Sequence, residues 1–478
     1  MKKLISVVLS VLILFTAFPI AVATASTGKK LGDIESENVF YKYKKSTKTL
    51  VLSGSGYYTT DYDCLEGGFK FSTQYQLDSY ANKVEHIEIG EGITAISGAS
   101  FAYFKNLKTI SLPNTIKKIE AFAFYECYNL ESITLPDSLE EIGYEAFRSC
   151  RKLKKLNIPK NVRKIEDNFI LDTPRLKTLT VDDENPYFCD ENNVVYNADK
   201  TKLLAVAPKQ EKVIIPNSVT KIRDLAFALS SVKEITIPKS VKTLGNGAFY
   251  KSDIEKITFK KGVGIKSFGT AYWYYGDDIG EYYGAFESCK NLKRLVVPAS
   301  VVSIEFRALG GCSSLEYLYI GKGVQVVGPD SFYNCKSLKK IRVNKENKKV
   351  FTKNGALYQK VKLKSKKVLE LTFVPVSKTS FIINKDTYQI GTFAFANGNI
   401  KNIKIPKNVR TIGLGAFYNC KKLRTVKFAT GSKLSKINSG KSDVYFVRSC
   451  YKKPNLNGYK VFKNCEKLKK IEYPKSFK

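Results

Sequence analysis

The sequence predicts a repeat solenoid, a strand-rich fold in which short units of chain stack along one axis. Two adjacent units, NTIKKIEAFAFYECYNLESITLP and DSLEEIGYEAFRSCRKLKKLNIP, have the same length and the same pattern of apolar residues. Pro113, Pro136 and Pro159 lie 23 residues apart, as do Cys127 and Cys150. A fixed period between about 20 and 50 residues is typical of solenoids, so the repeat decides the fold class before any single segment does.

Each unit predicts one short strand followed by a turn. The run L-x-x-I-x-I-P alternates apolar and other positions as a strand does, and its proline ends the strand because proline has no N–H for the sheet. The following V-x-x-I-x-x-x-A-F-x-x-C spaces its apolar residues three and four apart, which favours one short turn of helix. Stacked units therefore predict one continuous parallel sheet with turns or short helices on the opposite face.

The first residues are typical of an export signal. Residues 1–25 contain Lys2 and Lys3, an apolar run over Leu4–Phe15 and the small residues Ala23-Thr24-Ala25. The alternative is a transmembrane helix, but the apolar run is short for a span and no stop-transfer flank follows it. We therefore expect a mature chain that begins near Ser26, has no transmembrane span, and is secreted or associated with the cell surface.

The rest of the chain divides into a cap and the repeats. Residues 26–83 differ from the repeat pattern and alternate as strands do, which predicts an N-terminal β cap for the first unit. Residues 84–478 contain about a dozen repeat units. Inserts, two of them with the pattern of β-hairpins, interrupt the units near residues 182–214, 260–283, 344–384 and 438–458.

The formal charge of +35 is concentrated at the C-terminal end. Residues 344–478 contain 32 basic and 6 acidic residues, a net charge of +26. A basic surface of this density attracts polyanions. The alternative is a lysine-rich surface that keeps the protein soluble, and lysines beside the last unit also protect an open sheet edge from aggregation.

The repeat unit x-x-I-x-I-P-x-x-V-x-x-I-G-x-x-A-F-x-x-C-x-x-L resembles the BspA-like leucine-rich repeats of bacterial surface proteins. The resemblance covers roughly Val84–Pro474, although the glycine of I-G is kept only at positions such as Gly143, Gly245, Gly328 and Gly413. It implies a secreted or surface-attached horseshoe that binds host or matrix proteins or glycans and has no catalytic residues of its own. We accordingly expect a monomer without cofactor or metal.

Histidine and cysteine chemistry is limited by composition. His86 is the only histidine, so Ser-His-Asp, Cys-His and His-zinc sites would all require it, and its place in the strand-like run VEHIEIG favours an exposed strand position. Seven of the ten cysteines occupy one slot of the repeat: Cys127, Cys150, Cys289, Cys312, Cys335, Cys420 and Cys465. Neighbouring slots in a stack lie close enough for disulfides, but their side chains point in parallel, which favours buried free thiols over bridges.

Two surfaces are candidates for ligand binding. If the I-x-I residues point inward, the positions between them face outward along the inner curve of the horseshoe. In the later units these positions are aromatic and cationic: Arg294, Tyr317, Tyr319, Lys340, Arg342, Lys404 and Lys427. The second candidate is the aromatic insert of Tyr272, Trp273, Tyr274 and Tyr275, whose rings suit either binding or packing against the solenoid.

Together these observations predict an adhesin-like binding scaffold rather than an enzyme. The predicted partners are host, matrix or envelope proteins or glycans. The alternative is a structural protein whose basic C-terminal third holds it to anionic cell-wall polymers. Nucleic acid is disfavoured as a partner because the chain carries an export signal and shows no base-reading motif.

Overall fold

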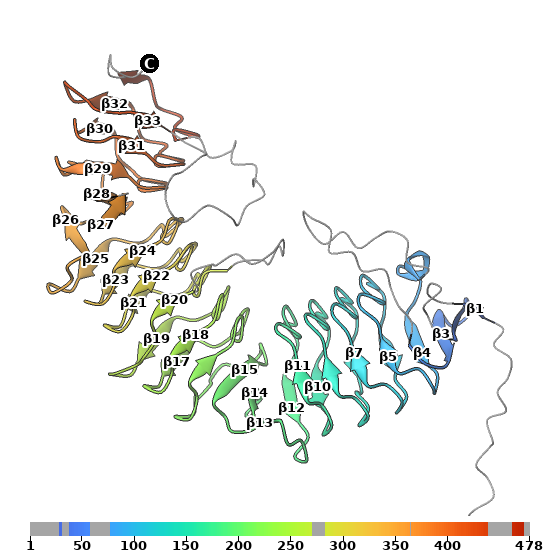
Figure 1. Ribbon diagram of the computed structural model, residues 1–478. Coiled ribbons are helices and arrows are strands. Elements are labelled where there is room, and N and C mark those ends of the chain that lie inside the picture. The colour runs from blue at the N-terminus through green and yellow to red at the C-terminus, as the bar shows by residue number, and fades with distance from the viewer. Residues whose placement is uncertain are drawn as a thin grey trace, which may run out of the picture.

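The computed structural model describes residues 28–30, 38–57, 77–269, 283–363, 365–437 and 461–472. The chain forms a β-solenoid of about 14 turns, stacked into an open arc (Figure 1). Each regular turn contributes two strands rather than one. The strands of successive turns pair in parallel, so the turns form two rows, named here the I-x-I row and the V-x-x-I row after their sequence patterns.

The I-x-I row begins with a four-residue strand and repeats every 23 residues in its first part, with pairs such as Lys155 with Thr178 in register. Its strands are β4 (His86–Ile89), β6 (Thr109–Ser111), β8 (Ser132–Ile133), β10 (Lys155–Ile158), β12 (Thr178–Val181), β17 (Glu234–Ile237), β19 (Lys256–Phe259), β21 (Arg294–Val296), β23 (Tyr317–Ile320), β25 (Lys340–Val343), β30 (Asn402–Ile405), β32 (Thr425–Phe428) and β34 (Lys470–Glu472).

The V-x-x-I row consists mainly of two-residue strands. They are β5 (Ala95–Ile96), β7 (Lys118–Ile119), β9 (Glu141–Ile142), β11 (Lys164–Ile165), β16 (Lys221–Ile222), β18 (Thr243–Leu244), β20 (Ser267–Phe268), β22 (Ser303–Ile304), β24 (Val326–Val327), β29 (Thr387–Ile390), β31 (Thr411–Ile412) and β33 (Lys436–Ile437). The expectation of one continuous sheet is therefore wrong. The chain after each proline turns back and pairs with the neighbouring turns as a second row.

The two rows lie on different sides of the arc. In Figure 1, β18, β20, β22 and β24 lie toward the inside of the arc, and β17, β19, β21 and β23 lie toward its outside. The expectation that the I-x-I row lines the inner curve is therefore wrong, because the V-x-x-I row lies nearer to the inside of the arc.

The segment A-F-x-x-C forms a turn and not the expected turn of helix. Ala99 and Tyr103 have φ values of 55° and 64°, and a left-handed residue recurs at both places in most later turns. The N–H of Phe101 donates to the carbonyl of Ala123 in the next turn, whereas the N–H of Ala102 closes a tight turn on Ala99. Alternate N–H groups thus bond between turns, and a helix cannot form. The described helix is the three-residue 3₁₀ segment Asp78–Tyr80, and nothing in the described chain is a helix long and apolar enough to cross a membrane.

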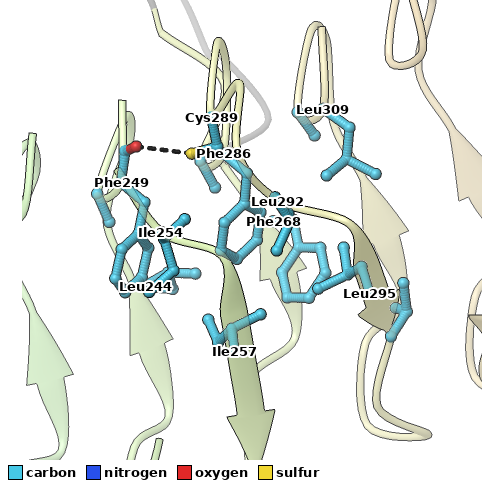
Figure 2. Packing of buried hydrophobic residues seen from close by; sticks show 14 of the residues in the cluster. Leu244, Phe249, Ile254, Ile257, Phe268, Phe286, Cys289, Leu292, Leu295 and Leu309 are labelled. Atoms are coloured by element: carbon cyan, nitrogen blue, oxygen red, sulfur yellow. Dashed lines mark hydrogen bonds between the residues drawn. The ribbon is translucent and has the colours of Figure 1, made fainter. Parts of the chain in front are cut away.

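In the core, side chains at equivalent positions of successive turns stack on one another. Phe249 and Phe286 stack with ring centroids 5.4 Å apart, and the thiol of Cys289 donates to the carbonyl of Phe249 at 2.9 Å (Figure 2). The other six slot cysteines donate in the same way to a carbonyl of the preceding turn. All eight described cysteines are free, which confirms the prediction of thiols for the slot, and burial raises the pKa of Cys335 to about 12.

Two β-hairpin inserts separate the three largest hydrophobic clusters of this core. The first insert contains β13 (Phe188–Glu191), β14 (Val194–Asn197) and β15 (Lys202–Val206), and the second contains β26 (Val350–Lys353), β27 (Ala356–Leu363) and β28 (Lys366–Phe373). Tyr196 packs in the middle cluster and Val195 in the N-terminal one. Likewise Leu357 packs in the middle cluster and Tyr358 in the C-terminal one. Because strand side chains alternate, each insert contributes side chains to the core on both of its sides.

The N-terminal strands continue the I-x-I row. These are β1 (Lys29–Lys30), β2 (Val39–Lys44) and β3 (Thr49–Gly54), and β3 pairs in parallel with β4. The antiparallel β2–β3 hairpin turns at residues 45–48, where Lys48 has a φ of 51°. Its apolar side chains, among them Val39 and Leu50, are buried with those of the first turns.

Candidate functional site

Three neighbouring strands of the I-x-I row carry a face of aromatic and cationic side chains. We name it the Tyr–Arg face, and it consists of Arg294, Tyr317, Tyr319, Lys340 and Arg342 on β21, β23 and β25. The guanidinium of Arg294 lies 4.4 Å from the ring centroid of Tyr317, a cation–π contact. The hydroxyl of Tyr319 accepts a hydrogen bond of 3.0 Å from the amide of Asn344. The two tyrosines are thus held in place while half-exposed.

The charges of this face are not neutralised by neighbouring acids. Arg294, Lys340 and Arg342 are exposed and form no ion pair with a residue that the structure describes. In the N-terminal half, by contrast, cations commonly pair with acids of the previous turn, as Lys154 does with Glu131 at 3.1 Å. Unpaired cations beside held aromatic rings are typical of surfaces that bind a partner.

The structure does not bring all the predicted site residues together. Lys404 and Lys427 are adjacent on β30 and β32, beyond the second insert, and Lys427 lies 3.8 Å from Glu472. The aromatic insert of Tyr272, Trp273, Tyr274 and Tyr275 lies outside the described residues. His86 is a partly exposed strand residue, as predicted, with Nδ1 2.8 Å from the hydroxyl of Thr109.

A second basic surface escaped the sequence-based prediction. A hollow of about 590 Å³ lies beside the second insert, and we name it the cationic hollow. It is lined by Phe351, Lys360, Lys367, Val368, Leu369, Asn384, Asp386, Tyr388, Asn408, Arg410 and Lys433. These residues are far apart in sequence and come from the three strands of the second insert and from the three turns that follow it. The excess of basic residues after Asn344 indicated a basic surface in this part of the chain, but the charge alone did not indicate which residues form the hollow.

A buried hydrogen-bond network around the carboxyl group of Glu370 joins four strands beside this surface. Glu370 on β28 accepts 3.0 Å hydrogen bonds from the side-chain amides of Gln359 on β27 and Gln389 on β29. The amide of Gln359 also bonds both backbone groups of Val327 on β24, each at 3.0 Å. Burial raises the pKa of Glu370 to about 7, and the hydrogen bond from Gln359 opposes that rise only in part.

Within the described ranges, no group of three His, Cys, Asp or Glu side chains is placed to hold a metal ion.

The sequence matches the profile of the BspA type leucine rich repeat region over residues 77–197, 204–282, 277–368 and 366–478. The chain belongs to the BspA-type leucine-rich-repeat family. No curated protein matches the chain.

Solved structures of bacterial leucine-rich-repeat proteins are similar to this member of the family. A leucine-rich repeat protein from Eubacterium ventriosum matches with a TM-score of 0.51 and 18% identity, over 92% of this chain and 95% of that one, and shows the same fold. A leucine rich cell surface protein from Faecalibacterium prausnitzii gives a TM-score of 0.42 and 19% identity over 95% and 97% of the two chains. The pneumococcal vaccine antigen PcpA gives 0.43 and 18% over 80% and 94%.

Proposed function

We propose that this protein is a secreted or surface-associated binding scaffold without catalytic activity, an adhesin-like protein that captures host, matrix or envelope proteins or glycans. The observation that carries the proposal is the Tyr–Arg face. Its cations are unpaired, so no ion pair has to be broken when a partner binds. Its rings are held by Arg294 and Asn344, which reduces the cost of ordering side chains on binding. Membership of a repeat family with bacterial relatives described as a cell surface protein and a vaccine antigen supports the proposed location.

The test is capture by an array of glycans and matrix proteins, probed with Ser26–Lys478 at two salt concentrations. Replacing Tyr317, Tyr319, Lys340 and Arg342 together by serine should weaken capture by about tenfold or more, since aromatic and arginine side chains dominate such surfaces. The matched control replaces Thr178 and Thr180, which lie at the same strand positions on β12. Unchanged capture by the Tyr–Arg variant would reject the face as the binding surface.

A second candidate function follows from the basic C-terminal third. In this alternative, the protein is a structural component that its basic C-terminal third holds to anionic cell-wall polymers by charge. Residues 344–478 carry the net charge of +26, and few of their lysines pair with acids in the described part. Retention on washed cells that is lost in high salt would favour this function, because salt screens charge-driven attachment.

A further inference from the structure

We propose that the cationic hollow binds an anionic saccharide, a sugar chain bearing carboxylate or sulfate groups. This site shares no residue with the Tyr–Arg face, and the proposal does not rest on the function assigned to that face. It also differs from diffuse attraction of the basic C-terminal third to polyanions, because it assigns a defined place and a defined stoichiometry.

The hollow exists because the second hairpin extends beyond the turn that it enters. After the pair Gln359–Glu370, β27 and β28 continue for four more pairs, from Lys360 with Leu369 to Leu363 with Lys366. This extension forms one side of the hollow. The other side comes from the following turns, where the backbone N–H of Arg410 bonds the carbonyl of Tyr388 and that of Ser435 bonds the carbonyl of Arg410. Tyr388, Arg410 and Ser435 therefore lie one above another on successive turns.

The lining combines charge, amide groups and an aromatic ring. Its four cations are Lys360, Lys367, Arg410 and Lys433, and its one acid is Asp386, so the net charge is +3. None of the four cations forms an ion pair with a residue in the described ranges. In water these charges repel one another, and an anion of matching size relieves the repulsion.

The polar groups are positioned by the fold. The amide of Asn408 donates to the carbonyl of Lys385 at 3.1 Å, which leaves its side-chain oxygen available as an acceptor. The side-chain oxygen of Asn384 accepts from the N–H of Asp386 at 3.3 Å, and the N–H of Asn384 donates to the hydroxyl of Tyr358. These contacts fix two amides of the lining before any ligand binds, so less ordering is needed on binding.

The lining fits a sugar with acidic groups better than a simple ion. The positive charges of lysine and arginine complement carboxylate or sulfate groups, and the arginine guanidinium can form bidentate hydrogen bonds with either group. Amides and Asp386 suit the hydroxyls of a sugar, and the half-buried ring of Tyr388 offers a flat amphipathic surface. The volume lies within the usual range of about 300–1,000 Å³ for ligand pockets, and the hollow is open to solvent, as a segment of a longer chain requires.

The test is calorimetric titration of Ser26–Lys478 with three probes at physiological salt. The probes are a heparin-derived hexasaccharide (sulfate and carboxylate), a hyaluronan hexasaccharide (carboxylate alone) and tripolyphosphate (charge without sugar). We expect binding at one site per chain for at least one saccharide, and weaker binding of tripolyphosphate. The two saccharides distinguish sulfate from carboxylate as the recognised group. Equal binding of tripolyphosphate would overturn the saccharide assignment, and absence of binding to both saccharides would overturn the site.

Two variants locate the binding. The double variant K360A/R410A should weaken saccharide binding by about tenfold or more, as loss of paired charges at a recognition site does. The matched control K345A/K348A removes the same charge from exposed lysines that do not line the hollow. An equal loss in both would show diffuse attraction and overturn the proposal.

The variant Y388L keeps an apolar side chain but removes the aromatic ring, and it should weaken saccharide binding while leaving tripolyphosphate unchanged. If Y388L leaves saccharide binding unchanged, the ring has no part in recognition and the saccharide class is rejected. Failure of the Tyr–Arg face variant in array capture leaves these outcomes unaffected, so the two proposals fail separately.

Discussion

The two hairpin inserts are anchored to the preceding turn of the solenoid by the same pattern of hydrogen bonds. Asn185 in the first and Asn347 in the second each donate to two carbonyls of the preceding turn, at 2.7–3.0 Å and 2.9–3.0 Å respectively. Each also accepts, through Oδ1, the N–H groups two and three residues further on. A register shift follows at the same place, before Tyr196 and before Tyr358.

Beyond this common frame the two inserts differ. In the first, β14 ends at Asn197 and β15 begins at Lys202, and Asn197 Oδ1 accepts the N–H of Lys202 to close the tip at once. In the second, the equivalent pair is Gln359 and Glu370, which are buried, and the hairpin continues past them. The shared asparagine contacts thus fix the position of each insert in the repeat. The second hairpin differs by the buried Glu370 and by its longer strands, which provide one side of the cationic hollow.

The buried Glu370 should give the second insert a pH dependence that the first lacks. Its folded pKa of about 7 lies above the usual 4.5, so between these values the folded chain keeps a proton that the unfolded chain releases. The free energy of unfolding should therefore fall as pH rises through this window, by up to about 3 kcal/mol, and stay level above it. Urea unfolding across the window should show this fall in the wild type and a smaller one in E370Q.

The matched control for this prediction is K202Q, which changes the exposed equivalent position in the first insert. Other buried acids, such as Asp330 with a pKa raised to about 7 by burial, contribute equally to all three proteins and cancel in the comparison. An identical pH profile for the wild type and E370Q would contradict the assignment.

Asn185 and Asn347, which anchor the two inserts, should both stabilise the fold, but by different amounts of unfolding free energy. N185A and N347A each leave two carbonyls and two N–H groups without their partner, which should cost about 2 kcal/mol of unfolding free energy. Because Asn185 is buried and Asn347 is partly exposed, water replaces more of the lost bonds in N347A, and N185A should cost more. Chemical denaturation of both variants checks the order, and the reverse order would show that the two inserts are not held alike.

Much of this frame could be predicted from the sequence because it repeats. The 23-residue period and the parallel stacking follow from spacing, and the free thiols in the cysteine slot were favoured by the parallel direction of its side chains. All three are confirmed. The turn of helix was wrong because spacing of three and four also fits a chain with left-handed residues such as Phe122 and Glu126, where alternate N–H groups bond between turns.

The cationic hollow could not be predicted in the same way. Its residues come from one hairpin and three later turns, so no local pattern brings Lys360 near Arg410. The Tyr–Arg face, in contrast, follows from strand alternation alone, and its residues do lie side by side on β21, β23 and β25, although toward the outside of the arc. Its role in binding remains a prediction.

The paired tyrosines offer a finer comparison of the two inserts. The hydroxyl of Tyr358 accepts the buried N–H of Asn384 at 3.1 Å, and among described residues the hydroxyl of Tyr196 has no such partner. Y358F should therefore cost about 1–2 kcal/mol by leaving that N–H unpaired, while Y196F should change stability little. Thermal unfolding of the two variants measures this, and equal effects would show that the hydrogen bond from Asn384 does not distinguish the two tyrosines.

The smallest expected changes in unfolding free energy come from substitutions near the hairpin tips, and their sign differs between the two inserts. Lys362 faces Lys367 across β27 and β28, whereas Lys200 in the first insert already pairs with Glu191 at 2.8 Å. K362E should therefore stabilise the fold by roughly half a kcal/mol, and K200E should destabilise it by a similar amount, as cross-strand charge pairs do. Both effects should shrink in high salt. Since Lys367 lines the hollow, K362E should also weaken saccharide binding, so a gain in stability with a loss of binding would show that the facing lysines are kept for the ligand.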